Sequence, residues 1–481
     1  MDSALKLGFI PARRAIFPAE PARRGRAETI EALKKCGADV VALDPSLTEL
    51  GCVESLDEAR ATAALFRREE VRGIVIGAMN FGDEQAAALT IRMAALDVPV
   101  LIFGLEEEET LRPATQRRDS LCGLLSIGEA LRQVGARYSV GATPIASAAS
   151  HALAADIDWF ARVCRVVTGI RGARFGQVGA RPDAFWTCRV NEKALQRLGV
   201  TVVSLDLSEA VQAVNSMPDD SPAVREIVRE MEETLDTSGV SKEVLARLGK
   251  FERFLLGFAE TNRLDALAVQ CWDSLQATLG ICACLPMSRL GDRGIPCACE
   301  SDVNGALSMH ALRLAAGAPS ALADINNLHN EDPDLVNVWH CGVFPTSYAK
   351  EKARVGAHFL MGQTLGPERA SGVVEFRMKE GPLTLGRVTE DGDGRWKAFV
   401  LEGAVEANPA ATSGAYGWCR ISGFMRIYSQ TLLRRFPHHA AIAPGHWGNA
   451  LYEAFGAYLG METYVPEQAT AGAYVPGMPF G

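Results

Sequence analysis

The stretch from Cys297 to Asp324 constrains the fold of this chain more than any other part of the sequence. It begins with a short apolar run that fits a buried strand, continues with a helical pattern that ends at Gly317, and closes with a second apolar run at residues 320–324. This pattern predicts a strand–helix–strand unit with two parallel strands joined by a right-handed crossover. Glu300 and Asp324 then fall at the carboxyl ends of these strands, where ligands usually bind in open α/β sheets.

The two acids of this unit predict a metal site. Neighbouring parallel strands lie about 4.8 Å apart, so the carboxylates of Glu300 and Asp324 would face one point in space. Two carboxylates held this close repel each other unless a proton or a cation lies between them. We therefore expect a divalent metal ion at this point.

The rest of the chain predicts an α/β protein of several domains, because 481 residues are too many for one hydrophobic core. Residues 1–150 alternate strands and helices, as in a doubly wound α/β domain, but lack the GxGxxG motif of dinucleotide-binding proteins. Residues 151–354 repeat this alternation and carry the two acids. Residues 355–481 contain β-like runs with glycine-rich turns, which predict a C-terminal antiparallel β-barrel-like domain.

Composition excludes several classes of protein. The net charge of −9 is spread along the chain without a basic patch, so we expect no nucleic-acid partner. No stretch of about 20 residues is apolar enough to span a membrane, and the N-terminus has no signal-peptide pattern. The 12 cysteines include several within apolar runs, where they act as small hydrophobic residues, and the zinc-type spacing with two intervening residues is absent. Reduced cysteines predict a cytoplasmic protein.

Histidines are scarce and unevenly placed, eight in all. His438 and His439 are adjacent, and this pair is either a capping turn or the source of a metal ligand. Adjacent residues of an extended chain point to opposite sides, so only one of the pair should face a metal. His446 follows seven residues later as an alternative ligand. His340 follows an apolar run and is either a core histidine or a ligand.

Other polar residues stand where a sugar could bind. Gln270 and Trp272 follow a predicted strand and offer a hydrogen-bonding amide and a stacking ring. Asn80 lies at the carboxyl end of a predicted strand, where it either contacts a ligand or belongs to a surface loop.

Two carboxylates and one imidazole suit a divalent ion such as Mn²⁺ that keeps positions open for substrate oxygens. A carboxylate at such a site is placed to take a proton from carbon or oxygen and to return it. This chemistry predicts aldose–ketose isomerisation through a cis-enediol. Two alternatives remain open: a metal-dependent aldolase or other carbon–carbon lyase acting on a ketose, and a non-catalytic sugar-binding protein.

The sequence CESDVNGALSM, which contains Glu300, resembles the metal-carboxylate region of the L-fucose isomerase/L-arabinose isomerase family, and Asp324 follows at a similar spacing. The opening residues 7–11 and the late pair His438–His439 also match in order. The resemblance implies two N-terminal α/β domains and a C-terminal β domain. It implies that Glu300, Asp324 and His439 bind Mn²⁺, or another divalent ion such as Co²⁺ or Mg²⁺, and that the two acids move protons between C1 and C2.

The resemblance also implies the residues that contact the substrate, a deoxy sugar, a pentose or hexose, or an anionic sugar. His438 would lie near the sugar, and His340 resembles a further histidine of the arabinose branch. The family's arginine after the first strand falls at Ile10, so Arg13 or Arg14 would replace it. Four arginines, Arg13, Arg14, Arg23 and Arg24, either serve a sulfonated or phosphorylated sugar or form a surface cluster. The resemblance further implies a homo-oligomer, a hexamer or trimer, with active sites shared between subunits.

Overall fold

The computed structural model describes residues 4–109, 113 and 115–465. It divides into two compact units. Of the described residues, the first unit contains those up to Thr168 together with Tyr452–Gly460, and the second contains Gly169–Leu451 and residues 461–465. The predicted division into three domains, with boundaries near residues 150 and 354, stays a prediction. No helix in the described part of the chain is both long and apolar enough to cross a membrane.

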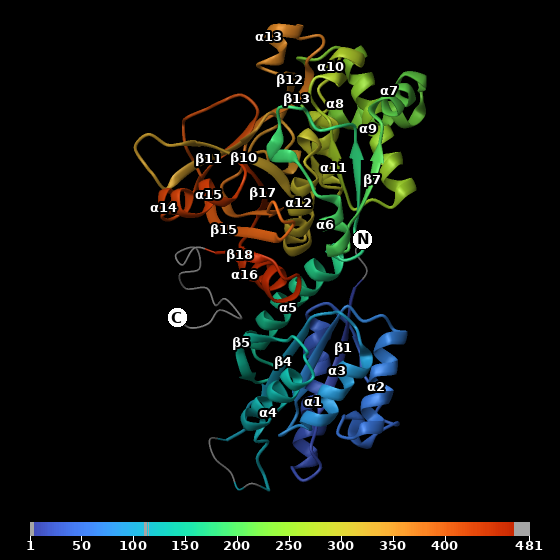
Figure 1. Cartoon of the computed structure of the whole chain (residues 1–481), viewed down its shortest axis with the longest axis vertical. Helices are drawn as coiled ribbons and strands as arrows, with labels where there is room; N and C mark the ends of the chain where they lie inside the picture. Colours follow the sequence, from blue (N-terminus) through green and yellow to red (C-terminus); the bar gives the residue numbers. More distant parts are fainter. Residues whose placement is uncertain (1–3, 110–112, 114, 466–481) are drawn as a thin grey trace. The chain divides into compact units, whose positions relative to one another are not determined.

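The first unit is built on a parallel sheet of strand order β2-β1-β3-β4-β5 (Figure 1). Alternate side chains of β1 enter two cores, because Phe9 packs with α1 and α5 and Ile10 packs with α2, α3 and α4. This is the doubly wound arrangement expected from the sequence. The elements are β1 Leu5–Ala12, α1 Ala19–Lys35, β2 Ala38–Val41, η1 Glu49–Gly51, α2 Leu56–Arg68, β3 Gly73–Ala78, α3 Glu84–Ala94, β4 Val100–Leu105, α4 Ser120–Gln133, β5 Ser139–Ala146 and α5 His151–Ile170.

The second unit begins with a smaller parallel sheet of strand order β7-β6-β8-β9. Its long helix α9 buries leucines and phenylalanines in the core of this unit. The elements are β6 Arg174–Val178, η2 Trp186–Cys188, α6 Glu192–Leu198, β7 Thr201–Leu205, α7 Leu207–Ser216, α8 Pro222–Thr234, α9 Lys242–Asn262, β8 Ala266–Val269, α10 Ser274–Thr278, α11 Cys284–Asp292, β9 Cys297–Ala298, η3 Cys299–Ser301 and α12 Val303–Ala316.

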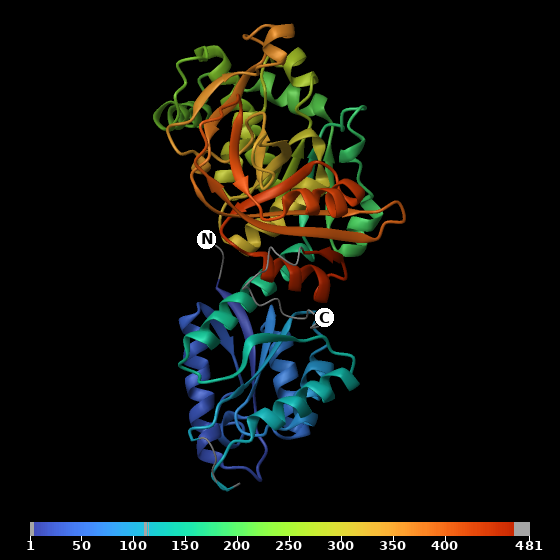
Figure 2. The ribbon, with the colours of Figure 1, turned by 90° about the vertical axis from the view of Figure 1, so that its left-hand side faces the viewer.

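The second sheet of this unit is large and mixed, with strand order β12-β13-β16-β11-β10-β17-β14-β15-β18. Figure 2 shows its C-terminal strands in orange and red. Most neighbours are antiparallel, but β13 with β16 and β15 with β18 are parallel, so a purely antiparallel sheet was the wrong expectation. The predicted barrel stays a prediction. The elements are β10 Ala321–Leu328, β11 Leu335–His340, η4 Thr346–Tyr348, β12 Arg354–Ala357, α13 Met361–Leu365, β13 Ser371–Arg377, β14 Gly381–Glu390, β15 Trp396–Glu406, β16 Ala415–Arg420, α14 Phe424–Ile427, η5 Tyr428–Leu432, α15 Leu433–Arg435, β17 His439–Pro444, α16 Gly448–Glu453 and β18 Glu462–Tyr464. The end of α16, from Tyr452, and the following η6 Ala454–Tyr458 belong to the first unit.

The segment from Cys297 to Asp324 differs from the sequence-based expectation in one respect. The helix is confirmed, since α12 begins after its N-cap Asp302 and ends at Gly317, whose φ of 66° suits glycine. The predicted parallel pairing of the two flanking strands is wrong. Strand β9 joins the parallel sheet, whereas β10 lies antiparallel between β11 and β17 in the mixed sheet. Helix α12 therefore connects two sheets rather than two neighbouring strands.

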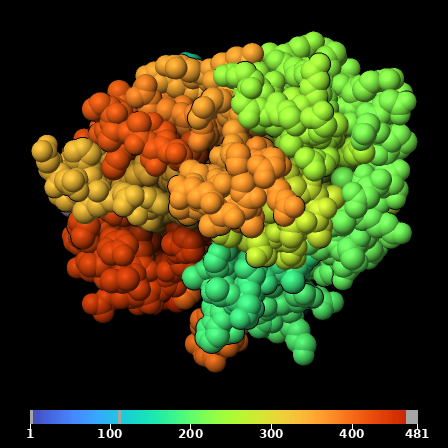
Figure 3. All heavy atoms as spheres, turned by 90° about the horizontal axis from the view of Figure 1, so that it is seen from above, coloured from blue at the N-terminus to red at the C-terminus, as the bar shows by residue number. Residues whose placement is uncertain are grey.

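Distant parts of the sequence meet on the surface of the second unit. Figure 3 shows green, orange and red segments side by side on one of its faces. A functional site in this unit can therefore draw on residues that are far apart in the chain.

Candidate active site

Asp324 and His439 form a cross-strand pair at the centre of the candidate site. They are direct partners in the antiparallel register of β10 and β17, which brings the imidazole Nε2 to 3.4 Å from the Asp324 Oδ1. Both atoms are buried, and neither has a hydrogen-bond partner among the described residues. Buried polar atoms are normally satisfied, so this pair indicates a place for a ligand.

Glu300 reaches the same point from the other sheet. Its Oε2 lies 3.5 Å from the Nε2 of His439. Glu300 sits in η3, directly after β9, with a φ of 63°, which is unusual for a residue other than glycine and is typical of functional sites. Burial raises the pKa of the Glu300 carboxyl, and the charges of His439 and His340 oppose this rise only in part. We call Glu300, Asp324 and His439 the carboxylate site.

Asp302 holds His439 in place, and the sequence analysis did not predict it as a residue of the site. Its carboxylate accepts hydrogen bonds from Arg387 Nη1 at 2.6 Å and Nη2 at 2.9 Å, and it contacts His439 Nδ1 at 2.8 Å. With Nδ1 held in this way, the imidazole presents Nε2 to the two acids. Burial alone would raise the pKa of Asp302, but Arg387 and His439 hold that pKa well below its usual range. One signal was available, because Arg387 is a charged residue within an apolar strand.

His438 and His340 lie beside the carboxylate site. His438 Nε2 is 3.5 Å from the Asp324 Oδ1, and its side chain is 48% exposed. His438 lies in a bend before β17, so the alternation of an extended chain does not apply and both adjacent histidines approach Asp324. His340 ends β11, and its ring centroid is 5.7 Å from that of His439. The backbone N–H of Cys341 donates to His340 Nδ1 at 2.9 Å.

Cys188 adds a thiol that the sequence analysis did not predict. It ends η2, and its Sγ donates to the Glu300 Oε2 at 3.7 Å. Two sets of candidate metal ligands share His439, one with Cys188 and Glu300 and the other with Asp324 and His438, and within each set the ligand atoms lie within 4.8 Å of one another. His446 belongs to no such set among the described residues, and its Nε2 contacts the Gly403 carbonyl oxygen at 2.9 Å.

Gln270 and Trp272 lie in the loop after β8. The side chain of Gln270 organises this loop, because its Oε1 accepts from the Ala180 N–H at 2.9 Å and its Nε2 donates to Ser274 Oγ at 3.1 Å. Trp272 is half-buried and meets the ring of His358 edge-on at 5.7 Å. The amide of Gln270 is thus already used within the loop, while the Trp272 ring belongs to an aromatic cluster.

Asn80 and Arg13 belong to the first unit, at the carboxyl edge of its sheet. Asn80 is buried, and its Oδ1 accepts from the backbone N–H groups of Arg14 at 3.0 Å and Gly82 at 3.1 Å. Arg13 is buried and forms ion pairs with Glu49 at 3.3 Å and Glu54 at 3.6 Å. Both side chains therefore support loops in this unit.

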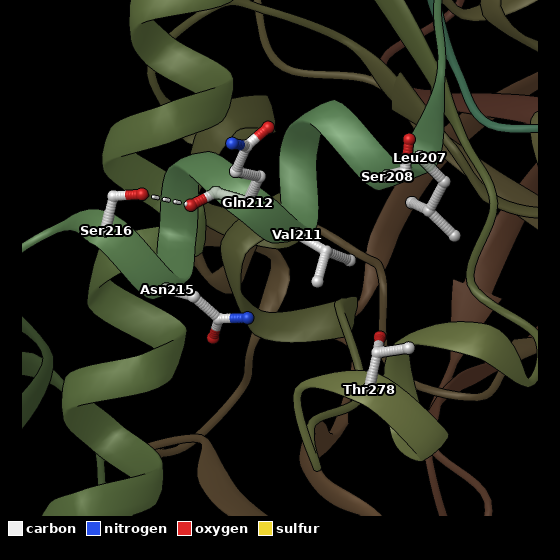
Figure 4. Close-up of a pocket in the computed structure, with 7 residues that line it drawn as sticks. All are labelled: Leu207, Ser208, Val211, Gln212, Asn215, Ser216 and Thr278. Carbon is white, nitrogen blue, oxygen red and sulfur yellow. Dashed lines mark hydrogen bonds between the residues drawn. The ribbon is translucent and has the colours of Figure 1, made fainter.

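A surface pocket of about 610 Å³ between α7 and α10 lacks the chemistry of an active site (Figure 4). Ser216 Oγ donates to the backbone carbonyl of Gln212 there at 2.6 Å. None of its lining residues is an acid, a base or a thiol; they are Leu207, Ser208, Val211, Gln212, Asn215, Ser216 and Thr278. The carboxylate site, by contrast, combines two acids with an imidazole.

Comparison with known proteins gives matches at both ends of the chain. The domain family described as fucose/sulfoquinovose isomerase, N-terminal domain, matches residues 8–171, and L-fucose isomerase, C-terminal domain, matches residues 338–465. The proteins named sulfoquinovose isomerase in Priestia aryabhattai and Priestia megaterium are each 26% identical over 82% of this chain and 84% of their own. One of the same name in Alkalicoccus urumqiensis is 28% identical over 71% of this chain and 74% of its own.

These matches agree with the family resemblance seen in the sequence. From these matches it follows that the chain is an enzyme, an intramolecular oxidoreductase of the aldose–ketose isomerase class. The chain belongs to the fucose isomerase-like family of sugar isomerases.

Proposed function

We propose that this chain is a metal-dependent isomerase that interconverts an aldose and a ketose by proton transfer through a cis-enediol. One observation carries the proposal: Glu300, just after β9, and Asp324, in β10 of the other sheet, both lie within 3.5 Å of the His439 Nε2. Such a cluster of two acids and an imidazole is the donor set expected for a divalent cation with open coordination positions.

The residues of the carboxylate site fit a divalent ion, and Mn²⁺ is our proposal, with Co²⁺ or Mg²⁺ as alternatives. The fit rests on the buried Asp324 Oδ1 and His439 Nε2, which have no hydrogen-bond partner among the described residues. The ion pairs of Asp324 in the described part of the chain are with two imidazoles, those of His438 and His439. Glu300, Asp324 and His439 would hold the ion. When bound, it would supply Lewis-acid polarisation of the carbonyl and adjacent hydroxyl of the sugar.

The chain's own residues would move the protons. One of the two acids removes the proton from C2 of the aldose and returns it to C1, while the other carries the hydroxyl proton from O2 to O1, so that no atom is gained or lost. Burial raises the pKa of the Glu300 carboxyl, which favours its uptake of a proton. Asp302 fixes the orientation of His439, and the half-exposed His438 would contact the sugar hydroxyls.

We propose a sulfonated monosaccharide as the substrate. Support comes from the relatives named sulfoquinovose isomerase and not from the four N-terminal arginines, because each of these already has an acidic partner: Glu49 for Arg13, Glu84 for Arg14, Glu20 for Arg23 and Glu108 for Arg24. Contacts of the substrate with Arg13, Asn80, Gln270, Trp272 and His340 remain proposals. The family resemblance further supports a homo-oligomer, a hexamer or trimer, with shared active sites.

The test is a product analysis by NMR with Mn²⁺ added and the sugar dissolved in D₂O. Sulfoquinovose and L-fucose are compared as substrates. We expect one ketose with the same carbon number as the aldose, no turnover after chelation of the metal, and faster conversion of the sulfonated sugar. Two shorter products would instead identify a carbon–carbon lyase, and conversion that persists after chelation would reject metal dependence.

A further inference from the structure

Four cysteines from four separate elements meet in the core of the second unit. Cys271 follows β8, Cys284 begins α11, Cys299 begins η3 and Cys341 follows β11. All four are buried, and all are free thiols. We call this set the thiol cluster.

The sulfur atoms of the thiol cluster form one continuous group. The Sγ atoms of Cys271 and Cys299 are 2.8 Å apart, and those of Cys284 and Cys341 are 3.9 Å apart. Cys299 and Cys341 join the two pairs, because their Sγ atoms and a ring nitrogen of His340 all lie within 4.8 Å of one another. The parallel register of β8 and β9, with Ala268 opposite Ala298, brings Cys271 and Cys299 together.

We propose that the thiol cluster is a second metal site, which binds one thiophilic d¹⁰ cation of the Zn²⁺ class. Thiolates around tetrahedral zinc, with Zn–S bonds of about 2.3 Å, lie roughly 3.8 Å from one another. The separation of Cys284 and Cys341 already matches this value. Cys271 and Cys299, with sulfur atoms 2.8 Å apart, are closer than this value, so their side chains would rotate apart to complete a set of four sulfur ligands around the ion.

The chemistry of this site differs from that of the carboxylate site. Thiolates select soft ions such as Zn²⁺, whereas carboxylates suit harder ions such as Mn²⁺. His340 is not counted among the ligands, because its Nδ1 already accepts the Cys341 backbone N–H. Cys299 directly precedes Glu300 and Cys341 directly follows His340, so an ion in the thiol cluster would fix the backbone that carries both. This inference does not depend on the proposed substrate or reaction.

Cd²⁺ is the probe, because its thiolate complexes show an ultraviolet charge-transfer band that carboxylate and imidazole ligands do not give. The full-length protein is kept reduced, with Mn²⁺ in excess to occupy the carboxylate site. We expect one Cd²⁺ per chain to bind with this band. Cys341→Ser and Cys299→Ala should each weaken Cd²⁺ binding at least tenfold, and Zn²⁺ should raise the Tm of the unaltered protein but not of these variants.

Two matched variants separate the thiol cluster from other ligands. Cys122→Ser removes an exposed cysteine of the first unit, and Asp324→Asn alters the carboxylate site; both should leave the band unchanged. Circular dichroism identifies any variant that does not fold, and Cys284→Ala then replaces it. The absence of the band in the unaltered protein, its persistence in the thiol-cluster variants, or its loss in Cys122→Ser would each overturn the proposal.

Discussion

The carboxylate site and the thiol cluster are neighbours in sequence and opposites in chemistry. Cys299 contacts another thiol, while the next residue, Glu300, approaches the imidazole of His439. The carboxylate site keeps buried oxygen and nitrogen atoms without hydrogen-bond partners among the described residues, whereas the thiols contact each other. Unsatisfied oxygen and nitrogen atoms cost far more in a protein core than thiols do, so the carboxylate site makes the stronger case for a ligand.

The largest expected effect is a loss of turnover when an acid of the carboxylate site is replaced. Glu300→Gln and Asp324→Asn should each lower turnover by at least about 10³-fold, because each removes a proposed proton-transfer group and a metal ligand. The rate is measured by NMR with Mn²⁺ present. Glu331→Gln, at an exposed acid, is the matched control and should keep full activity. Normal turnover in either active-site variant would reject the carboxylate site.

Removal of the shared imidazole should affect metal binding next most strongly. His439→Ala should weaken Mn²⁺ binding at least about 100-fold, since one of three proposed ligands is lost while the acids remain. Isothermal titration calorimetry measures the affinity. His446→Ala is the comparison, because its imidazole contacts a backbone carbonyl instead. A loss in His446→Ala with none in His439→Ala would show that the late histidine was assigned wrongly.

Asp302→Asn tests whether the contact of Asp302 with the His439 Nδ1 contributes to Mn²⁺ binding. Loss of the charged partner should weaken Mn²⁺ binding about 10- to 100-fold. It should also lower the free energy of unfolding by about 3–5 kcal/mol, because Arg387 is left buried without its carboxylate. Urea unfolding measures this change in the free energy of unfolding. The double variant Asp302→Asn/Arg387→Met should recover part of the stability but none of the metal affinity, and unchanged affinity in the single variant would contradict the role of Asp302.

The smallest effect concerns a buried acid of the first unit that has no cation beside it among the described residues. Glu453 accepts from Ser139 Oγ at 2.6 Å, and burial raises its pKa to about 7. The folded state therefore holds this proton after the unfolded state has lost it, so stability should fall as the pH rises from about 4.5 to 7, by on the order of 3 kcal/mol at most. Urea unfolding at several pH values should show this slope, and Glu453→Gln should flatten it. An unchanged slope in the variant would assign the pH dependence to other groups.

The helices and strands were predicted from the sequence better than the pairing of the strands. Helix α12 and its end at Gly317 follow from local signals, a capping residue and a glycine in the left-handed region. The strand after it was paired wrongly, because a short apolar run does not reveal whether it lies beside β9 or beside β17, more than 100 residues later. The pattern of residues 297–324 pointed to Glu300 and Asp324, and the family resemblance added His439 as their partner. Asp302 was missed since its partner Arg387 is 85 residues away.

The thiol cluster is a further example of contacts between distant residues that the sequence does not reveal. Its four cysteines lie in separate stretches of the chain without a zinc-type spacing, and each one alone reads as a small core residue. The pairing of β8 with β9 and the positions of α11 and of the end of β11 bring them together.

Anomalous diffraction at the manganese edge, from crystals grown with Mn²⁺, tests the central claim most directly. We predict one strong peak per chain, within bonding distance of a Glu300 oxygen, an Asp324 oxygen and the His439 Nε2, and no such peak in Asp324→Asn. A single peak at any other group of residues, in crystals of a protein that isomerises its sugar, would contradict the account.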